Sequence, residues 1–94
     1  MSTAVVHAPN LNRYQLLIDG EVSGFTEYHL SGNDIVFTHT EVDPARQEHG
    51  LGGELVTGAL DQVRDDTSYR LVAVCPFIVS WLTKHPEYQD LQQR

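Results

Sequence analysis

A glycine-rich segment at residues 47–53 lies where the hydrophobic pattern of the chain changes. Its residues are Gln47-Glu48-His49-Gly50-Leu51-Gly52-Gly53. Before it, apolar residues alternate with polar ones, as in half-buried strands; after it, they recur at helical spacing from Leu51 to Val63. A glycine turn between a strand and a helix lets backbone N–H groups approach the phosphates of a ligand, and the helix start favours an anion. The segment therefore predicts a strand that leads into a helix through a candidate anion-binding turn.

Two common phosphate-binding motifs do not match this segment. No Gly-Lys-Ser/Thr follows it, as a nucleotide P-loop requires, and the third-glycine spacing of a dinucleotide fingerprint is missing. A flexible connection that binds nothing is the alternative that the segment alone leaves open.

Alternating apolar residues predict three strands before the segment. We expect them at residues 14–18, 22–30 and 35–42. Asp19-Gly20 suits a two-residue type I′ hairpin turn, and Gly24 indicates a bulge or a close packing contact. Pro44 ends the third strand, because it has no backbone N–H and restrains the preceding residue from helical geometry. The expected product is an antiparallel three-strand meander.

The second half of the chain predicts a crossover and a closing helix. A helix is expected from about Gly50 to Asp65, and the continuously apolar residues 71–75 predict a strand covered on both faces. Strand, helix and strand in this order imply a right-handed parallel crossover. Pro76 suits the first position of a last helix that ends near His85. The fold class is α+β, with four strands in a mixed sheet and two packed helices.

The length of the chain suits one domain, since 94 residues leave little room for a second core. Residues 1–12 show no sustained periodicity, and we expect them to form a flexible leader to a single domain over residues 13–94. No apolar run approaches the ~20 residues that cross a bilayer, and the first residues lack the basic flank of a secretory signal.

The net charge of the chain limits the classes of partner that we expect it to bind. The formal net charge is −7, which repels nucleic acid and anionic lipid and is compatible with a cationic amine substrate. The lone Cys75 cannot form an internal disulfide, so we expect a cytoplasmic protein. One cysteine with scattered histidines shows no metal-ligand spacing, so no metal site is expected.

Three segments in order carry a resemblance to a known family. They are the Gln-x-x-Gly-x-Gly spacing from Gln47, Val74-Cys75-Pro76-Phe77 and His85-Pro86-Glu87-Tyr88. Together they resemble the minimal, single-domain branch of the GNAT acyltransferase superfamily, from about Arg13 to Leu91. The resemblance implies an N-acetyltransferase that moves the acetyl group of acetyl-CoA to an unidentified amine.

The resemblance also implies where acetyl-CoA binds. Proteins of this superfamily separate the two strands that flank the crossover helix and thread pantetheine between them, here residues 35–42 and 71–75. Backbone groups of the third strand contact pantetheine, and the glycine segment holds the pyrophosphate. The cofactor-binding residues implied are Glu41, Val42, Gln47, Glu48, His49, Gly50, Leu51, Gly52 and Gly53.

Cys75 and His39 are the candidate catalytic residues. A thiol at a helix start feels positive partial charge, which favours the thiolate; a buried small hydrophobe is the alternative. The resemblance adds a route through the cysteine, because the minimal family carries Cys-Pro-Phe here, and it places the counterpart of His39 nearby. We expect His39 on the face of Ile35, Phe37 and Glu41, as a base for Cys75 or for the amine, with a hydrogen-bonded sheet histidine as the alternative. Glu41 is the other candidate base, or else a solvated carboxylate.

The chain departs from full-length superfamily members because the helices that usually build the acceptor wall are missing from it. We therefore expect an acceptor site that is open, supplied by a partner or a homodimer, or absent. A noncatalytic acyl-CoA-binding or sensing module is the second hypothesis, and a plain interaction domain is the third.

Overall fold

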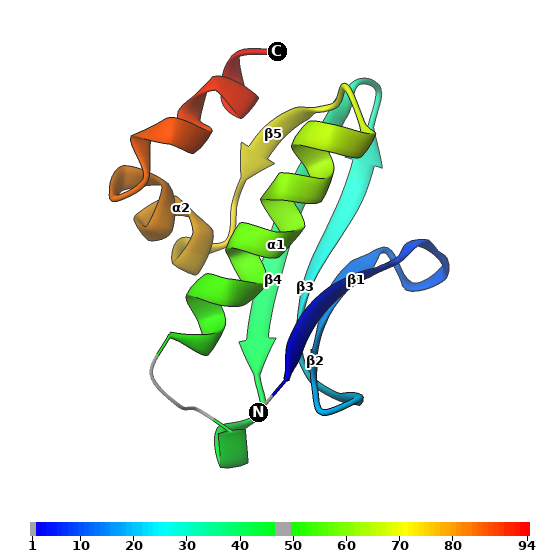
Figure 1. The fold of residues 1–94 in the computed structure, drawn as a ribbon. Coiled ribbons are helices and arrows are strands. Elements are labelled where there is room, and N and C mark those ends of the chain that lie inside the picture. The colour runs from blue at the N-terminus through cyan, green and yellow to red at the C-terminus, as the bar shows by residue number, and fades with distance from the viewer. Residues whose placement is uncertain (1, 47–49) are drawn as a thin grey trace.

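The computed structural model of the chain describes residues 2–46 and 50–94, and it shows a five-stranded sheet with its helices packed on one face (Figure 1). The strands are β1 Thr3–Ala8, β2 Arg13–Ile18, β3 Glu21–Ser31, β4 Asp34–Val42 and β5 Arg70–Ala73. The α-helices are α1 Leu51–Asp66 and α2 Pro76–Thr83, and the 3-10 helices are η1 Pro9–Leu11, η2 Pro44–Arg46 and η3 Pro86–Gln93.

The order of the strands in the sheet is β1-β2-β3-β4-β5. The first four pair antiparallel with their neighbours in the chain, and β5 pairs parallel with β4 after the crossover through α1. Asp19 and Gly20 both have positive φ, of 51° and 86°, as the type I′ hairpin turn requires. The expected meander, crossover and closing helix are therefore confirmed.

Strand β1 corrects the expectation of a flexible leader and adds a fifth strand to the expected four. It pairs with β2 along its whole length, from Thr3 opposite Ile18 to Ala8 opposite Arg13. Val5 packs against α1 at Gly58, where an added Cβ would lie 2.5 Å from Val5 Cγ2, and Gln62 Nε2 donates a hydrogen bond to the Val5 carbonyl at 2.8 Å. These contacts come from a helix more than fifty residues later, so local periodicity does not reveal them.

Two register shifts bend the meander. The first lies between Leu16 and Leu17 of β2, opposite the segment of β3 that contains Gly24. A Cβ on Gly24 would lie 2.9 Å from the Glu41 carbonyl oxygen, which confirms the close packing expected there. The second shift leaves Thr38 as an extra residue in β4, because Glu27 pairs with His39 and Tyr28 with Phe37.

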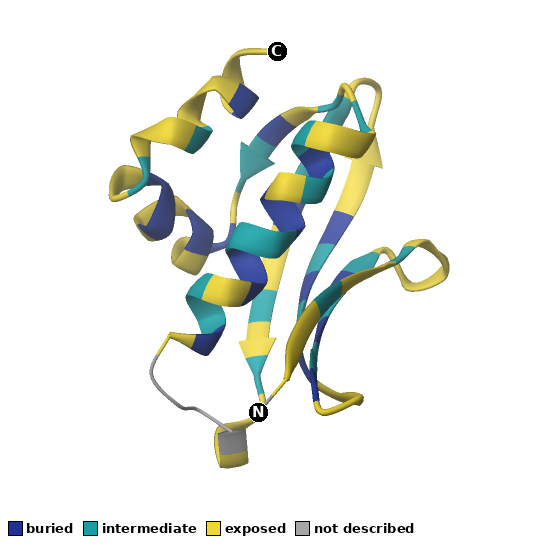
Figure 2. Cartoon of the chain, in the orientation of Figure 1, coloured by how far each residue is buried: buried dark blue, intermediate teal, exposed yellow. Residues whose placement is uncertain are grey.

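The core lies between the sheet and the helices, whose inner faces are buried (Figure 2). A second, smaller cluster contains Leu16, Ile18, Leu51 and Leu55 and anchors the start of α1 to the sheet. On the other face of the sheet the side chains that alternate with the core residues are half-buried or exposed, including Val72 of β5. The apolar run of β5 is thus covered on one face, not on both as the sequence predicted. No described helix is long and apolar enough to cross a membrane.

Candidate active site

Strands β4 and β5 separate part of the way along the sheet. Their pairing runs from Asp34 opposite Arg70 to Phe37 opposite Ala73, and β4 then continues to Val42, whereas β5 ends. The Phe37 carbonyl accepts hydrogen bonds from the N–H groups of both Val74 and Cys75, each at 3.0 Å, and the chain turns from there into α2. Beyond Phe37, β4 is therefore no longer paired with β5, and the chain after β5 leads away into α2 (Figure 1).

A groove of about 400 Å³ lies at this separation, where the end of β4 meets the starts of α1 and α2. It is lined by His39, Thr40, Glu41, Val42, Pro44, Gly52 and Phe77. Gly52 is in contact with the Phe77 ring, since an added Cβ would lie 2.7 Å from Phe77 Cζ. The fold thus brings three of the residues expected to bind the cofactor, Glu41, Val42 and Gly52, to one cavity.

The start of α1 faces the same region. Gly50 precedes the helix with φ 91°, a left-handed conformation that favours glycine. The first hydrogen bond of the helix runs from the Glu54 N–H to the Gly50 carbonyl, at 3.0 Å. The N–H groups that precede Glu54 in the first turn have no acceptor within the helix. Leu51 anchors this turn through its buried side chain. The expected cofactor-binding residues Gln47, Glu48 and His49 lie outside the described residues.

Cys75 precedes α2 and belongs to the core, with 4% of its surface exposed. Its Sγ lies 3.4 Å from Thr40 Oγ1, and Thr40 Oγ1 lies 3.0 Å from Thr26 Oγ1. Thr26 is fully buried, so these three side chains meet on the helix-covered face of the sheet. Nothing in the sequence marks Thr40 as a neighbour of Cys75, because the extra residue Thr38 brings it there.

His39 lies on the face opposite to Cys75, which corrects the expected placement. Its side chain is 56% exposed, its ring lies 5.9 Å from that of Phe25, and its Nε2 lies 3.7 Å from Glu41 Oε2. Regular alternation through Thr38 would put His39 on the face of Phe37. Because Thr38 is an extra, unpaired residue, the alternation is reversed after it, so that His39 faces outward and Thr40 takes the inward position. His39 and Glu41 do share a face, as expected.

The described residues contain no group of three or more His, Cys, Asp or Glu side chains placed to hold a metal ion. The described groove carries two exposed titratable side chains, His39 and Glu41, together with backbone groups on β4 and the start of α1.

The model of a family described as GCN5-related N-acetyl-transferase matches residues 13–91. No curated protein sequence matches the chain. Among solved structures, the chain is similar to the ribosomal-protein-alanine N-acetyltransferase from Brucella melitensis biovar Abortus 2308, with a TM-score of 0.57 and 20% identity. The match covers 68% of this chain and 50% of that one, so the chain spans about half the length of that protein. At 20% identity, this structural similarity is evidence for the fold of the chain alone.

Proposed function

The chain belongs to the GCN5-related N-acetyltransferase family, and we propose that it binds acetyl-CoA in the groove beside β4 and transfers the acetyl group to an amine. The observation that carries this proposal is the separation of β4 from β5 at Phe37, which opens the end of β4 directly opposite the first turn of α1. An extended ligand in the groove reaches the helix start with one end and Glu41 with the other.

The donor is held mainly by backbone. Glu41 and Val42 offer main-chain groups to pantetheine, and the N–H groups of Gly50 to Gly53 offer a positive pole to the pyrophosphate. Gly52 contributes its N–H in the first turn of the helix, and the absence of a side chain there lets Phe77 pack against α1 beside the groove. Backbone dipoles suit a protein with a net charge of −7, since acidic neighbours such as Glu54 oppose binding by side-chain charge.

The transfer we propose is direct. Glu41 takes a proton from the amine, the nitrogen attacks the thioester carbonyl carbon, and the C–S bond breaks to leave an amide and the CoA thiolate. The thiolate takes up the proton and leaves as the thiol. A backbone N–H of β4 stabilises the oxyanion that forms on the way. Of the two candidate bases, Glu41 borders both the groove and the opposite side of β4.

A route through Cys75 has less support. Its thiol is buried, interacts with Thr40, and lies on the other face of β4 from His39. The second candidate function is a noncatalytic acyl-CoA-binding or sensing module, which would use the same groove without a base. A homodimer and a cytoplasmic location stay predictions from the sequence.

The test is a titration of the protein with acetyl-CoA, followed by amide chemical shifts. We expect the largest changes at residues 50–53 and 41–42, and turnover with a panel of primary amines. Binding without turnover would favour the noncatalytic module, and no binding at millimolar acetyl-CoA would refute both functions.

The role of Gly52 in binding has to be separated from its packing against Phe77, which also lines the groove, so the reference protein is Phe77→Ala and not the wild type. Gly52→Val alone would collide with Phe77, so the comparison is made in Phe77→Ala, which removes the ring that an added Cβ would meet. In that background we expect Gly52→Val to weaken acetyl-CoA binding at least about tenfold by blocking the approach to the backbone. Equal affinity for acetyl-CoA in Phe77→Ala and in Phe77→Ala with Gly52→Val would contradict the proposal that the start of α1 binds the pyrophosphate.

A further inference from the structure

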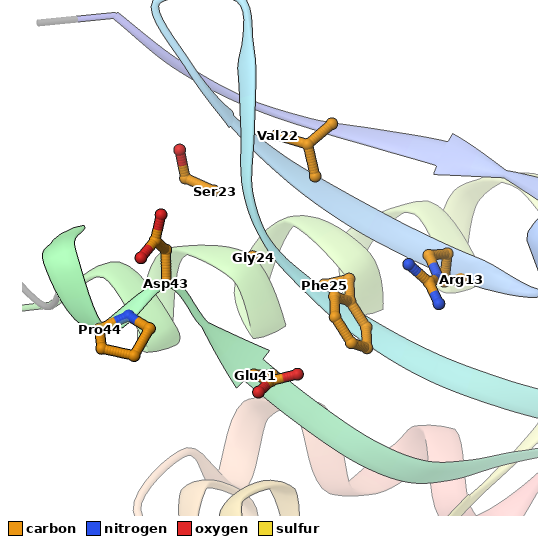
Figure 3. Close-up of a pocket in the computed structure, with 8 residues that line it drawn as sticks. All are labelled: Arg13, Val22, Ser23, Gly24, Phe25, Glu41, Asp43 and Pro44. Carbon is orange, nitrogen blue, oxygen red and sulfur yellow. The ribbon is translucent and has the colours of Figure 1, made fainter.

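A second cavity, of about 310 Å³, lies on the side of β4 that faces away from the helices (Figure 3). It is lined by Arg13, Val22, Ser23, Gly24, Phe25, Glu41, Asp43 and Pro44. Glu41 and Pro44 also line the groove, so the two cavities adjoin at the end of β4. A molecule in the second cavity and a molecule in the groove would therefore both lie next to Glu41.

The charge in this cavity is negative. Arg13 is the one cationic residue among the described lining residues, and its guanidinium donates to the Glu27 carboxylate at 2.9 Å while lying 4.0 Å from the centre of the Phe25 ring. Its charge is thus balanced by Glu27, which does not line the cavity. The carboxylates of Glu41, whose Oε2 lies 3.7 Å from His39 Nε2, and of Asp43 then supply two negative charges. The cavity favours a cation.

The shape and apolar walls of the cavity set a second requirement for its ligand. Val22, Phe25 and Pro44 form apolar walls that suit an alkyl chain. Glu41 and Asp43 are two positions apart at the end of a strand, which separates them by about 7 Å along an extended chain. Asp43 Oδ1 accepts the Ala45 N–H at 2.9 Å, and this hydrogen bond holds the carboxylate in place.

We propose that this cavity is the acceptor site and that it takes a small aliphatic diamine. One ammonium group pairs with Asp43, the alkyl chain lies along the apolar walls, and the second nitrogen reaches Glu41 at the border of the groove. Asp43 is then a specificity residue, because a monoamine or a lysine side chain brings one cation and cannot satisfy both carboxylates. The acceptor role rests on the proposed function, whereas diamine binding itself does not.

Binding is tested without acetyl-CoA, so that a failure of the proposed function stays distinguishable. Putrescine, butylamine and Nα-acetyl-lysine amide are titrated separately into the protein, and amide chemical shifts are followed. We expect putrescine to shift Gly24, Phe25 and Asp43 and to bind at least about tenfold more tightly than the two monoamines. Equal affinity for the three, or shifts centred on other residues, would overturn the proposal.

The Asp43→Asn variant tests the specificity residue. The amide oxygen of asparagine still accepts the Ala45 N–H, so the turn is kept while the charge is lost. We expect putrescine to bind this variant no more tightly than butylamine does, and the KM for putrescine in acetyl transfer to rise about tenfold while that for butylamine changes little. Asp65→Asn, on the exposed side of α1, removes the same formal charge and serves as the control. An equal loss of putrescine affinity in Asp43→Asn and Asp65→Asn would show that putrescine is attracted by the net charge of the protein, and it would overturn the proposed site.

Discussion

Replacement of Gly24 by alanine tests how closely β3 and β4 approach beside the groove. The new Cβ would lie 2.9 Å from the Glu41 carbonyl oxygen and 3.3 Å from Val42 Cα. The first distance is 0.5 Å shorter than 3.4 Å, the shortest distance of an ordinary van der Waals contact. Both neighbours are backbone atoms of a paired strand, so β4 itself must move, and it must move at the two residues that we propose contact pantetheine.

The cost follows from this geometry. Overpacking of a buried site costs about 1–3 kcal/mol, and alanine recovers about 0.4–1 kcal/mol by reducing the freedom of the unfolded chain. We therefore expect Gly24→Ala to lower the free energy of unfolding by about 1–2 kcal/mol, which for a domain of this size lowers Tm by roughly 5–15 °C. The assay is thermal unfolding followed by circular dichroism, combined with acetyl-CoA titration of the folded variant, whose affinity should also fall.

Gly53→Ala is the matched control for this prediction. An added Cβ there would meet only Trp81 Nε1, at 3.8 Å, which is an ordinary contact, and Gly53 lies within α1. Alanine in place of glycine stabilises a helix by up to about 1 kcal/mol, so Tm should stay level or rise. A Gly24→Ala protein with the Tm of the wild type or a higher one would refute the packing argument.

Two further predictions concern Cys75 and His7. Because Cys75 is buried, the native protein should react slowly with iodoacetamide, and Cys75→Ala should acetylate amines within about threefold of the wild-type rate; an acetyl adduct found on Cys75 by mass spectrometry after acetyl-CoA alone would contradict direct transfer. Burial lowers the pKa of His7 below its ordinary value of 6.5, against an opposing effect of Asp66. The unfolded state therefore binds more protons, and the contribution of His7 to stability is present above pH 6.5 and is lost as the pH falls through its lower folded pKa. Urea unfolding at pH 7.5, 6 and 5 should show a smaller loss of stability in His7→Gln than in the wild type, and identical losses would contradict this.

The elements that the sequence predicted well are those defined by local signals. The Asp19-Gly20 turn, the alternation in residues 14–18 and the helical stripe of α1 each depend on neighbouring residues, and each is found in the structure. The closing helix begins at Pro76, as the restricted geometry of proline predicts.

The features that the sequence did not reveal depend on distant residues or on one extra residue. Strand β1 is held by Gly58 and Gln62 of α1, and the outward placement of His39 follows from the bulge at Thr38. We did not predict this bulge, because threonine is an ordinary strand residue and only the pairing with β3 shows that Thr38 is the extra one; the bulge then reverses which of the following side chains face the core. The second cavity joins Arg13 of β2 to Asp43 after β4, about thirty positions apart, so no local motif could have identified it.

The order of the strands in the sheet, identical to their order in the chain, has a consequence for the folding pathway. Each antiparallel pair closes a short loop, whereas the pairing of β4 with β5 must first close a loop that contains all of α1. Closing the longer loop costs more entropy, and non-local pairings form slowly. The meander is then expected in the folding transition state before β5 docks. Destabilising substitutions in β5 should therefore accelerate unfolding more than they slow folding, and the groove beside β4 should be the last part of the protein to assemble.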